Sequence, residues 1–395
     1  MERVNWKMVA LVMGLVLAVG AVFGVAKLVD SNHRGEGERI EDMAMLNTAI
    51  RVEYSLFSEP QQLILEPAKV YLEKNGEVSL ETLKQNYRYE VDRLDEGLPV
   101  RISYEVKGMP EGCSVSTAVL EVAEDAQFSA PRHFTMSEDR CYADVYLLKA
   151  NTKYYFRIQL TLSNGASTGV SGDFTTADTP RLLSLDGAVN VRDIGGRTTV
   201  DGSTVRQGLL YRGSELDGAV NPDYRLSAIG AEHMLHVLKV RTRMDLRGPV
   251  EAAAGDPLGD SVRLVTVAAP KYADAFADGN AAALKQIFAE LAKANRYPIY
   301  MHDTDGTDQV GTVVYLLEAV LGMAEEDLNR EYRASILCHK SLPGTDMNNF
   351  LAALDGLNGA NRQEKAENYL LSIGVSEAEL DAIRDIFLEP PTAAE

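Results

Sequence analysis

The sequence predicts a multidomain chain: an N-terminal transmembrane helix, an all-β sandwich and a C-terminal α/β domain. An uncharged run lies near the start, short alternating segments fill the middle, and apolar strands alternate with helical patterns in the last part. The predicted parts are a membrane segment at 1–30, a stalk at 31–62, the sandwich at 63–178 and the α/β domain at 179–395.

The predicted membrane segment contains an uncharged stretch at residues 8–26, preceded by Arg3 and Lys7. About 20 apolar residues are enough to cross a bilayer as a helix. Basic residues favour the cytoplasmic side, so the rest of the chain is expected outside a cell membrane that the protein spans once. A cleaved signal peptide ending near residues 18–20 is the alternative, and it would make the protein secreted.

Charge and cysteine content exclude several kinds of partner. The net charge of -19 disfavours nucleic acid, whose binding depends on basic groups. The three cysteines form no CxxC pair, so no metal site is predicted. In an exported protein Cys113 and Cys141 could form a disulfide, or both could be small buried hydrophobic residues.

The middle of the chain has the strand-and-turn pattern of an antiparallel β-sandwich, for example at residues 100–106 and 154–160. Residues 148–158 resemble the corner between the fifth and sixth strands of fibronectin type III domains. In that corner a tyrosine hydroxyl bonds to upstream backbone, and Tyr154 is the matching residue. Residues 172–177 resemble the last strand of such a domain.

A second pattern begins after the boundary at residues 178–181, where a proline interrupts strand pairing. The apolar spacing predicts a helix over 281–294, a buried strand over 298–301 and a helix over 310–320 that ends before Gly322. Strands and helices in this order predict an α/β layer arrangement.

Three sequence islands and one loop in this domain resemble a bacterial protein-tyrosine and dual-specificity phosphatase family of hydrolases. The islands are residues 190–196, 205–214 and 244–247, and the loop is 302–309. The likeness covers roughly residues 180–388. It implies that the loop is a phosphate-binding loop between a strand and a helix N-terminus.

In that family a cysteine thiolate attacks phosphorus and an arginine clamps the phosphoryl oxygens. Here Asp303 stands at the cysteine position and Gln309 at the arginine position, so the loop is degenerate. The remaining loop residues that the resemblance implies are His302, Thr304, Asp305, Gly306, Thr307, Asp308 and Gly311.

Three carboxylates in this loop would repel a phosphate dianion, because like charges about 4 Å apart repel by about 4 kcal/mol at an effective dielectric of about 20. The Asp303 carboxylate could itself occupy the anion cradle, since a helix N-terminus stabilises a nearby anion. We therefore expect a loop that is structurally intact and catalytically silent.

The resemblance also implies that Asp245 and Asp308 act as acids or positioning groups. Asp193 and Asp245 could instead be turn carboxylates paired with Arg192 and Arg247.

Residues 303–307 also resemble the first motif of haloacid-dehalogenase-type phosphatases, in which an aspartate attacks phosphorus with the help of Mg²⁺. Fewer than about 100 residues follow Asp303, which is too few for the rest of that fold. A magnesium-dependent aspartate phosphatase on the tyrosine-phosphatase frame stays open.

The sequence therefore predicts a pseudophosphatase that acts as a binding module at the cell envelope, without a cofactor, for a protein or a surface polymer. An active phosphatase that uses Asp303 with Mg²⁺ and a purely structural scaffold are the alternatives.

Overall fold

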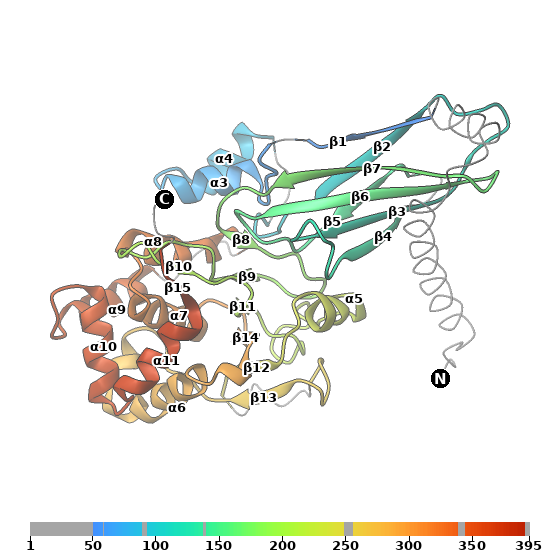
Figure 1. Cartoon of the computed structure of the whole chain (residues 1–395). Coiled ribbons are helices and arrows are strands. Elements are labelled where there is room, and N and C mark those ends of the chain that lie inside the picture. Colours follow the sequence, from blue (N-terminus) through green and yellow to red (C-terminus); the bar gives the residue numbers. More distant parts are fainter. Residues whose placement is uncertain are drawn as a thin grey trace.

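The computed structural model describes residues 50–57, 59–88, 93–136, 140–248, 256–338 and 344–391. The predicted membrane segment lies outside these residues, as does most of the predicted stalk. Within the described ranges, no helix has both the length and the apolar character needed to cross a membrane. Figure 1 shows a β-sandwich beside an α/β domain, with a pair of short helices over the latter.

Two antiparallel sheets form the sandwich. One has the order β1-β2-β5 and the other β4-β3-β6-β7. Their inward-facing side chains, among them Ile102, Leu120 and Phe156, are fully buried between the sheets. The strands are β1 (Arg51–Ser55), β2 (Val100–Lys107), β3 (Val115–Ala123), β4 (Arg132–Met136), β5 (Tyr142–Val145), β6 (Lys153–Leu162) and β7 (Ser167–Thr175).

Strand β1 lies within the predicted stalk and pairs with β2 along its whole length. Cys113 and Cys141 are both free, so the disulfide that the sequence left open is not formed.

Between β1 and β2 the chain leaves the sandwich and forms two helices, α3 (Glu66–Glu73) and α4 (Leu80–Asn86). This segment, residues 61–98, is called the insertion below. Pro67 lies in the first turn of α3, and the Ser79 side chain caps α4 by accepting a hydrogen bond from Thr82 N–H. The sequence reading, which expected only strands from residue 63, missed both helices.

The insertion packs on the α/β domain. Ala68, Leu72 and Leu94 are buried with Leu182 and Leu337 in one apolar cluster. A backbone hydrogen bond from Leu94 N to Leu337 O, 2.7 Å long, adds a strand-like contact between the two parts. The two parts of the chain are therefore joined through a buried surface as well as through the linker at residue 178.

The α/β domain is built on a six-stranded sheet of order β13-β12-β14-β11-β9-β8. Its first four strands are parallel to one another, and β9 and β8 continue the sheet antiparallel. The strands are β8 (Arg181–Leu182), β9 (Arg192–Asp193), β11 (Leu210–Gly213), β12 (Thr242–Asp245), β13 (Arg263–Thr266) and β14 (Ile299–His302). A separate two-stranded ribbon pairs β10 (Thr204–Val205) with β15 (Leu388–Glu389).

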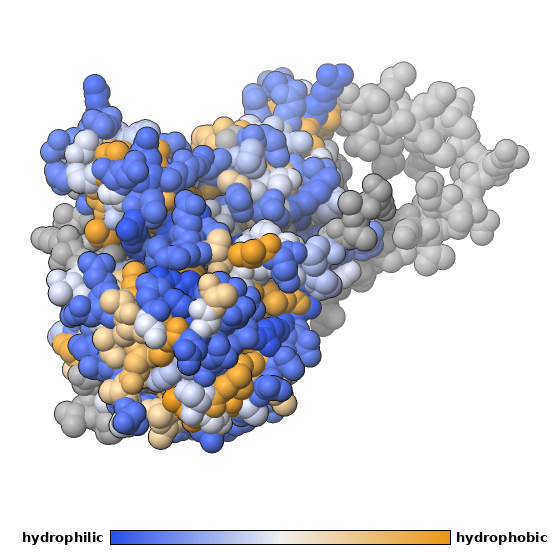
Figure 2. Space-filling model, turned by 90° about the vertical axis from the view of Figure 1, so that its left-hand side faces the viewer, coloured by the Kyte–Doolittle hydropathy of each residue, from blue (hydrophilic) through white to orange (hydrophobic). Residues whose placement is uncertain are grey.

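A helical layer covers the sheet and encloses the largest apolar core. The central helix α7 is buried along almost its whole length, as expected for an apolar helix between a sheet and other helices. Figure 2 shows the side that faces left in Figure 1, where hydrophilic residues predominate and hydrophobic residues gather in small patches over the C-terminal helices. The helices of this layer are α6 (Ala281–Leu291), α7 (Gln309–Val320), α8 (Glu325–Arg333), α9 (Gly344–Asp355), α10 (Arg362–Ser372) and α11 (Glu377–Phe387).

Helix α5 (Ala228–Glu232) continues into a π-helical turn, His233–Val237. It encloses a smaller apolar cluster with Tyr211 and Tyr300.

Candidate functional site: a phosphate-loop frame closed by an aspartate

The loop that resembles a phosphate-binding loop joins the end of β14 to the start of α7. Its turn depends on Gly306, which has a φ of 79°. A Cβ at this position would lie 2.6 Å from the backbone carbon of Gly213, so only glycine fits without a shift of β11. The strand, loop and helix that were predicted from the sequence therefore occur together.

Asp303 lies inside this loop and is 1% exposed. Its Oδ1 accepts hydrogen bonds from the backbone N–H groups of Asp305, at 3.1 Å, and Gly306, at 2.5 Å. Its Oδ2 accepts from Val310 N–H, in the first turn of α7, at 3.0 Å. The carboxylate thus occupies the donors that a loop of this kind presents to a phosphoryl group.

Burial, and after it the charge of Asp305, raise the pKa of the Asp303 carboxyl to about 6. The hydrogen bonds from Val310 and Gly306 lower this pKa, but they offset only part of the increase. Its neighbour His302 is also fully buried, and burial lowers the pKa of its imidazole to about 4. The centre of the loop therefore contains a neutral imidazole beside a carboxyl group that titrates near pH 6.

The other loop residues are held by hydrogen bonds and by side-chain packing. Asp305 Oδ1 accepts from Thr307 N–H at 3.2 Å, and Thr304 O accepts from Glu215 N–H at 3.0 Å. Gln309 is the first residue of α7 and half-buried, and Gly311 packs against the Tyr332 ring.

Asp308 is turned toward two tyrosines. Its Oδ1 accepts from Tyr272 Oη at 2.7 Å, and the Tyr272 and Tyr332 hydroxyls are 2.9 Å apart. Lys271 Nζ lies 3.4 Å from the other carboxylate oxygen. Burial and the contacts with Tyr332 and Asp308 raise the pKa of Tyr272, so its hydroxyl stays protonated and can donate.

Asp245 is brought close to the loop but is not available to a substrate. It is fully buried, and its carboxylate binds Arg247 through Nε at 2.9 Å and Nη2 at 2.7 Å. Burial alone would raise the pKa of Asp245, but its hydrogen bonds and ion pair with Arg247 hold it below its ordinary value. This geometry fits an ion pair that closes a turn better than a proton donor.

The expected pairing of Asp193 with Arg192 is wrong. The two residues are adjacent on β9, and side chains of neighbouring strand residues point to opposite faces. Asp193 pairs with Arg181 at 2.6 Å, whereas Arg192 pairs with Glu331 at 2.6 Å. Asp245 and Arg247, two residues apart, do pair as expected.

A buried ionic network that the sequence reading missed supports the loop from behind. Arg212 donates to Gly306 O at 2.5 Å and to Glu331 Oε2 at 2.7 Å. Burial would raise the pKa of Glu331, but Arg192 and Arg212 lower it to about 2. Arg212 lies in one of the quoted islands, but no sequence signal connected it with Glu331, which is far along the chain.

The insertion also reaches this loop. Asp95 Oδ2 accepts from Asn190 N–H at 2.7 Å, and the Asn190 side chain donates to Asp305 O at 3.0 Å. Asn190 has a φ of 57°, so it is held in the left-handed region that asparagine tolerates. One side of the loop is therefore positioned by a residue from the first half of the chain.

The chemistry of the site also depends on metal ligands and on thiols. Within the described ranges, no cluster of three or more histidine, cysteine, aspartate or glutamate side chains has a metal-binding arrangement. Cys338 follows α8, and burial raises the pKa of its thiol. A thiol of this kind is a poor source of thiolate.

Comparison with known proteins agrees with the arrangement of the strand, loop and helix. Residues 183–389, more than half of the chain, match the family model described as the tyrosine phosphatase family. No curated protein matches the sequence.

Two solved structures are similar at low identity. The core catalytic domain of the PP-IP phosphatase SIW14 from S. cerevisiae, in complex with citrate, is 14% identical, with a TM-score of 0.28 over 44% of this chain and 96% of that chain. The twitchin kinase region from C. elegans is 12% identical, with a TM-score of 0.16 over 73% of this chain and 65% of that chain. On the evidence of the family match, the chain belongs to the tyrosine phosphatase family.

Proposed function

We propose that this protein is a catalytically inactive member of the tyrosine phosphatase family that acts as a binding module at the cell envelope. The observation that carries the proposal is the Asp303 carboxylate, whose two oxygens accept three backbone N–H groups of the phosphate loop. Because the Asp303 carboxylate already accepts from these three N–H groups, they are not free to bind a phosphoryl oxygen.

The missing side chains support the same conclusion. Phosphoryl transfer by this family would need a thiolate in the loop and a guanidinium at its end, whereas the chain has Asp303 and Gln309 there. Cys338 does not replace the nucleophile, because burial keeps its thiol protonated. Arg212 does not replace the arginine, because it is fully buried and paired with Glu331 behind the loop.

The charge of the loop adds to the barrier. Asp303, Asp305 and Asp308 would face an incoming dianion, and each like charge about 4 Å away costs about 4 kcal/mol at an effective dielectric of about 20. Lys271 offsets only Asp308, at 3.4 Å.

We further propose that the sandwich is a fibronectin type III domain. Its support is the strand order, β1-β2-β5 against β4-β3-β6-β7, together with the corner tyrosine. Lys149 N–H donates to Tyr154 Oη at 2.9 Å, which is the backbone contact expected of that tyrosine.

We propose that the N-terminal segment sets where the two domains lie. An uncleaved N-terminal helix would place both domains outside the cell membrane, facing a protein or a surface polymer. Cleavage of the segment would release the same two domains as a secreted protein.

The decisive experiment is hydrolysis of an aryl phosphate by the purified full-length chain, with EDTA and then with Mg²⁺. We expect background rates in both. A metal-independent rate well above background contradicts the proposal, and a rate that appears only with Mg²⁺ supports the alternative in which Asp303 is the nucleophile.

A restored variant tests whether the loss is confined to the loop. We expect Asp303→Cys with Gln309→Arg to gain hydrolysis, because the glycine turn and the Arg212 support are in place. Gln309→Arg alone is the matched control and should stay inactive. A pull-down with the full-length chain and an envelope extract distinguishes a binding module, which retains a specific partner, from a scaffold, which retains none.

A further inference from the structure

Strand β7 is the last strand of the four-stranded sheet, so one of its edges has no neighbour within that sheet. At its C-terminal end this edge is covered, because Gln61 N–H donates to Thr175 O at 2.8 Å and Thr175 N–H donates to Glu59 Oε1 at 3.3 Å. Toward the start of β7, at residues 167–173, no strand of the described ranges pairs with this edge. These residues are called the open edge below.

The backbone groups that point out of the open edge follow from the pairing of β7 with β6. Alternate residues of an antiparallel strand exchange hydrogen bonds with one neighbour, and the residues between them direct their N–H and C=O groups to the other side. Thr175 directs its groups outward, toward Glu59 and Gln61. With the same period of two, the residues that direct these groups outward along the open edge are Ser167, Gly169, Ser171 and Asp173.

The open edge lacks the usual protection against pairing. Natural edge strands are commonly blocked by proline, lysine, a bulge or a covering segment. Residues 167–173 contain no proline or lysine, and their register with β6 has no bulge. Asp173 is the one charged side chain among them, and it pairs with Lys153 at 3.3 Å. The backbone of the open edge is therefore accessible to another extended strand.

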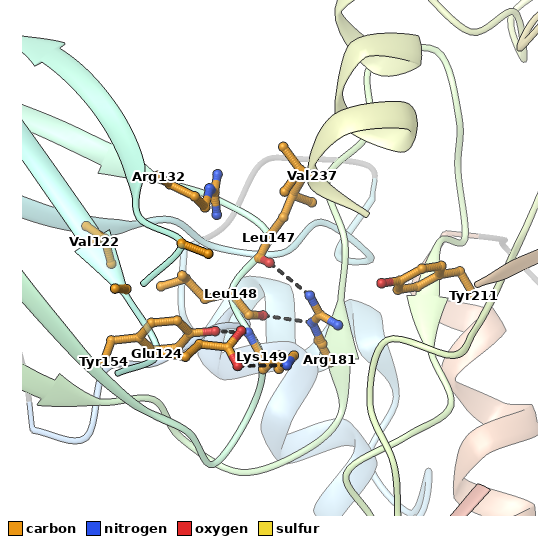
Figure 3. A pocket seen from close by; sticks show the side chains of 12 residues that line it. Val122, Glu124, Arg132, Leu147, Leu148, Lys149, Tyr154, Arg181, Tyr211 and Val237 are labelled. Atoms are coloured by element: carbon orange, nitrogen blue, oxygen red, sulfur yellow. Dashed lines mark hydrogen bonds and ion pairs between the residues drawn. The ribbon is translucent and has the colours of Figure 1, made fainter. Parts of the chain in front are cut away.

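The described part of the α/β domain lies at the other end of the sandwich. There Arg181 donates to the carbonyl oxygens of Leu147 and Leu148, each at 2.8 Å (Figure 3). Figure 1 shows the hairpin of β6 and β7 extending away from the α/β domain. The open edge therefore lies on a part of the sandwich that a second chain can approach.

A second copy of β7 fits the open edge in an antiparallel arrangement. A two-fold axis at Val170 pairs Ser171 with Gly169 of the second copy, and both residues direct their N–H and C=O groups outward, as a hydrogen-bonded pair requires. Asp173 then faces Ser167 of the second copy, so no like charges are opposed. The two half-buried Val170 side chains meet at the axis.

We infer that the protein self-associates through β7, as a two-fold dimer in which the open edges of two copies join their sheets. The Tyr54 ring, which lies against Gly172 and is 42% exposed, adds apolar surface beside the axis. This inference does not depend on whether the phosphate loop is active.

The dimer should be weak and should strengthen with salt. One pair of strands covers less surface than the roughly 1,600 Å² of a standard interface. Each copy carries a net charge of -19, so two copies repel each other at low ionic strength. Sedimentation of the full-length protein in detergent, between about 1 µM and 1 mM, measures the association at low and high salt.

A cysteine cross-link tests the register. The background is full-length protein with Cys141→Ala, which removes an exposed native cysteine. Val170→Cys places two thiols at a non-hydrogen-bonded pair across the axis, where the Cα atoms lie about 4.5 Å apart, and mild oxidation should give a covalent dimer. Thr168→Cys is the matched control, because it lies on the same face but about 13 Å from its own copy, and it should stay monomeric.

A backbone variant tests the hydrogen bonds of the open edge. Ser171→Pro removes an outward N–H that β6 does not use, so the sandwich should stay folded while association weakens at least tenfold. Ser171→Ala keeps this N–H and should associate like the parent. A parent that stays monomeric at every concentration, which would leave the edge to an extended peptide of another protein, overturns the inference. Equal cross-linking of Val170→Cys and Thr168→Cys, or unchanged association of folded Ser171→Pro, also overturns it.

Discussion

Val310 N–H donates to the Asp303 carboxylate at 3.0 Å, so the residue at the nucleophile position caps the helix that follows it. A carboxylate near a helix N-terminus interacts favourably with the dipole and with unpaired N–H groups. The same contact stabilises the loop and occupies a donor that a phosphate would need. Replacement of Asp303 therefore tests both effects.

Replacement of Asp303 by alanine should destabilise the protein and open the cradle. Three buried N–H groups lose their acceptor, and we expect a loss of about 2–4 kcal/mol in the free energy of unfolding at pH 7. Phosphate should restore part of this loss in the variant, since ligand bound only to the folded state stabilises it, and should leave the parent unchanged. Urea unfolding with and without phosphate measures both effects.

Asp381→Ala is the matched control, because that carboxylate is 70% exposed and pairs with nearby Arg384. A phosphate response of the parent equal to that of Asp303→Ala would show that Asp303 does not occupy the cradle.

The pH dependence of stability should contain a component from Asp303. Because its folded pKa of about 6 lies above the ordinary value of 3.8, the folded chain holds this proton more tightly than the unfolded chain. The stabilisation is fully present below about pH 4 and is lost as the pH rises through 6, by up to about 3 kcal/mol.

Asp303→Asn should lack this component. Unfolding of both proteins between pH 4 and pH 7 should therefore show the parent losing stability relative to the variant as the pH rises. Parallel curves would contradict the raised pKa.

The buried glutamates behind the loop should respond differently to neutralisation. Glu331→Gln leaves Arg192 and Arg212 without their carboxylate, and removal of one partner of a buried pair costs about 3–5 kcal/mol. Glu318→Gln should be nearly neutral, because burial and the charge of Glu331 raise the pKa of Glu318 well above its usual range. Chemical denaturation compares the two, and an equal loss for both would show that the network is not organised around Glu331.

The contact between the insertion and the loop should be detectable by hydrogen exchange. Asp95→Ala removes the acceptor of Asn190 N–H, and a hydrogen bond to a charged group contributes about 1.5–3 kcal/mol. We expect faster exchange at the amides of residues 305–307, because Asn190 also holds Asp305 O. Asp144→Ala, which breaks a half-exposed pair with Arg101 in the sandwich, should leave those amides unchanged.

Local patterns predicted the elements on which the site is built. The apolar run before His302 became β14, and the apolar run that ends before Gly322 became α7, one residue longer at its start than expected. Predicted helix 281–294 is shorter, with α6 ending at Leu291. Asp303 could be placed in the cradle from sequence because its neighbours keep the loop spacing.

Contacts between distant parts of the chain could not be predicted in this way. Glu331 neutralises two arginines that lie more than 100 residues earlier, and no local pattern connects them. Helices α3 and α4 were missed because short segments that are only half-buried against another domain carry a weak periodic signal. Adjacent Arg192 and Asp193 do not pair, because a strand directs the side chains of neighbouring residues to opposite faces, so proximity in sequence is no guide to contact here.

The insertion makes the linker at residue 178 a poor place to divide the protein. A fragment that begins there would expose Leu182, Ala334 and Leu337, which the insertion now covers, and would lose Asp95. An expressed C-terminal fragment should therefore tend to aggregate. A gene-shuffling event that transferred only the last 217 residues would carry over a damaged domain, so the two halves are expected to be inherited together.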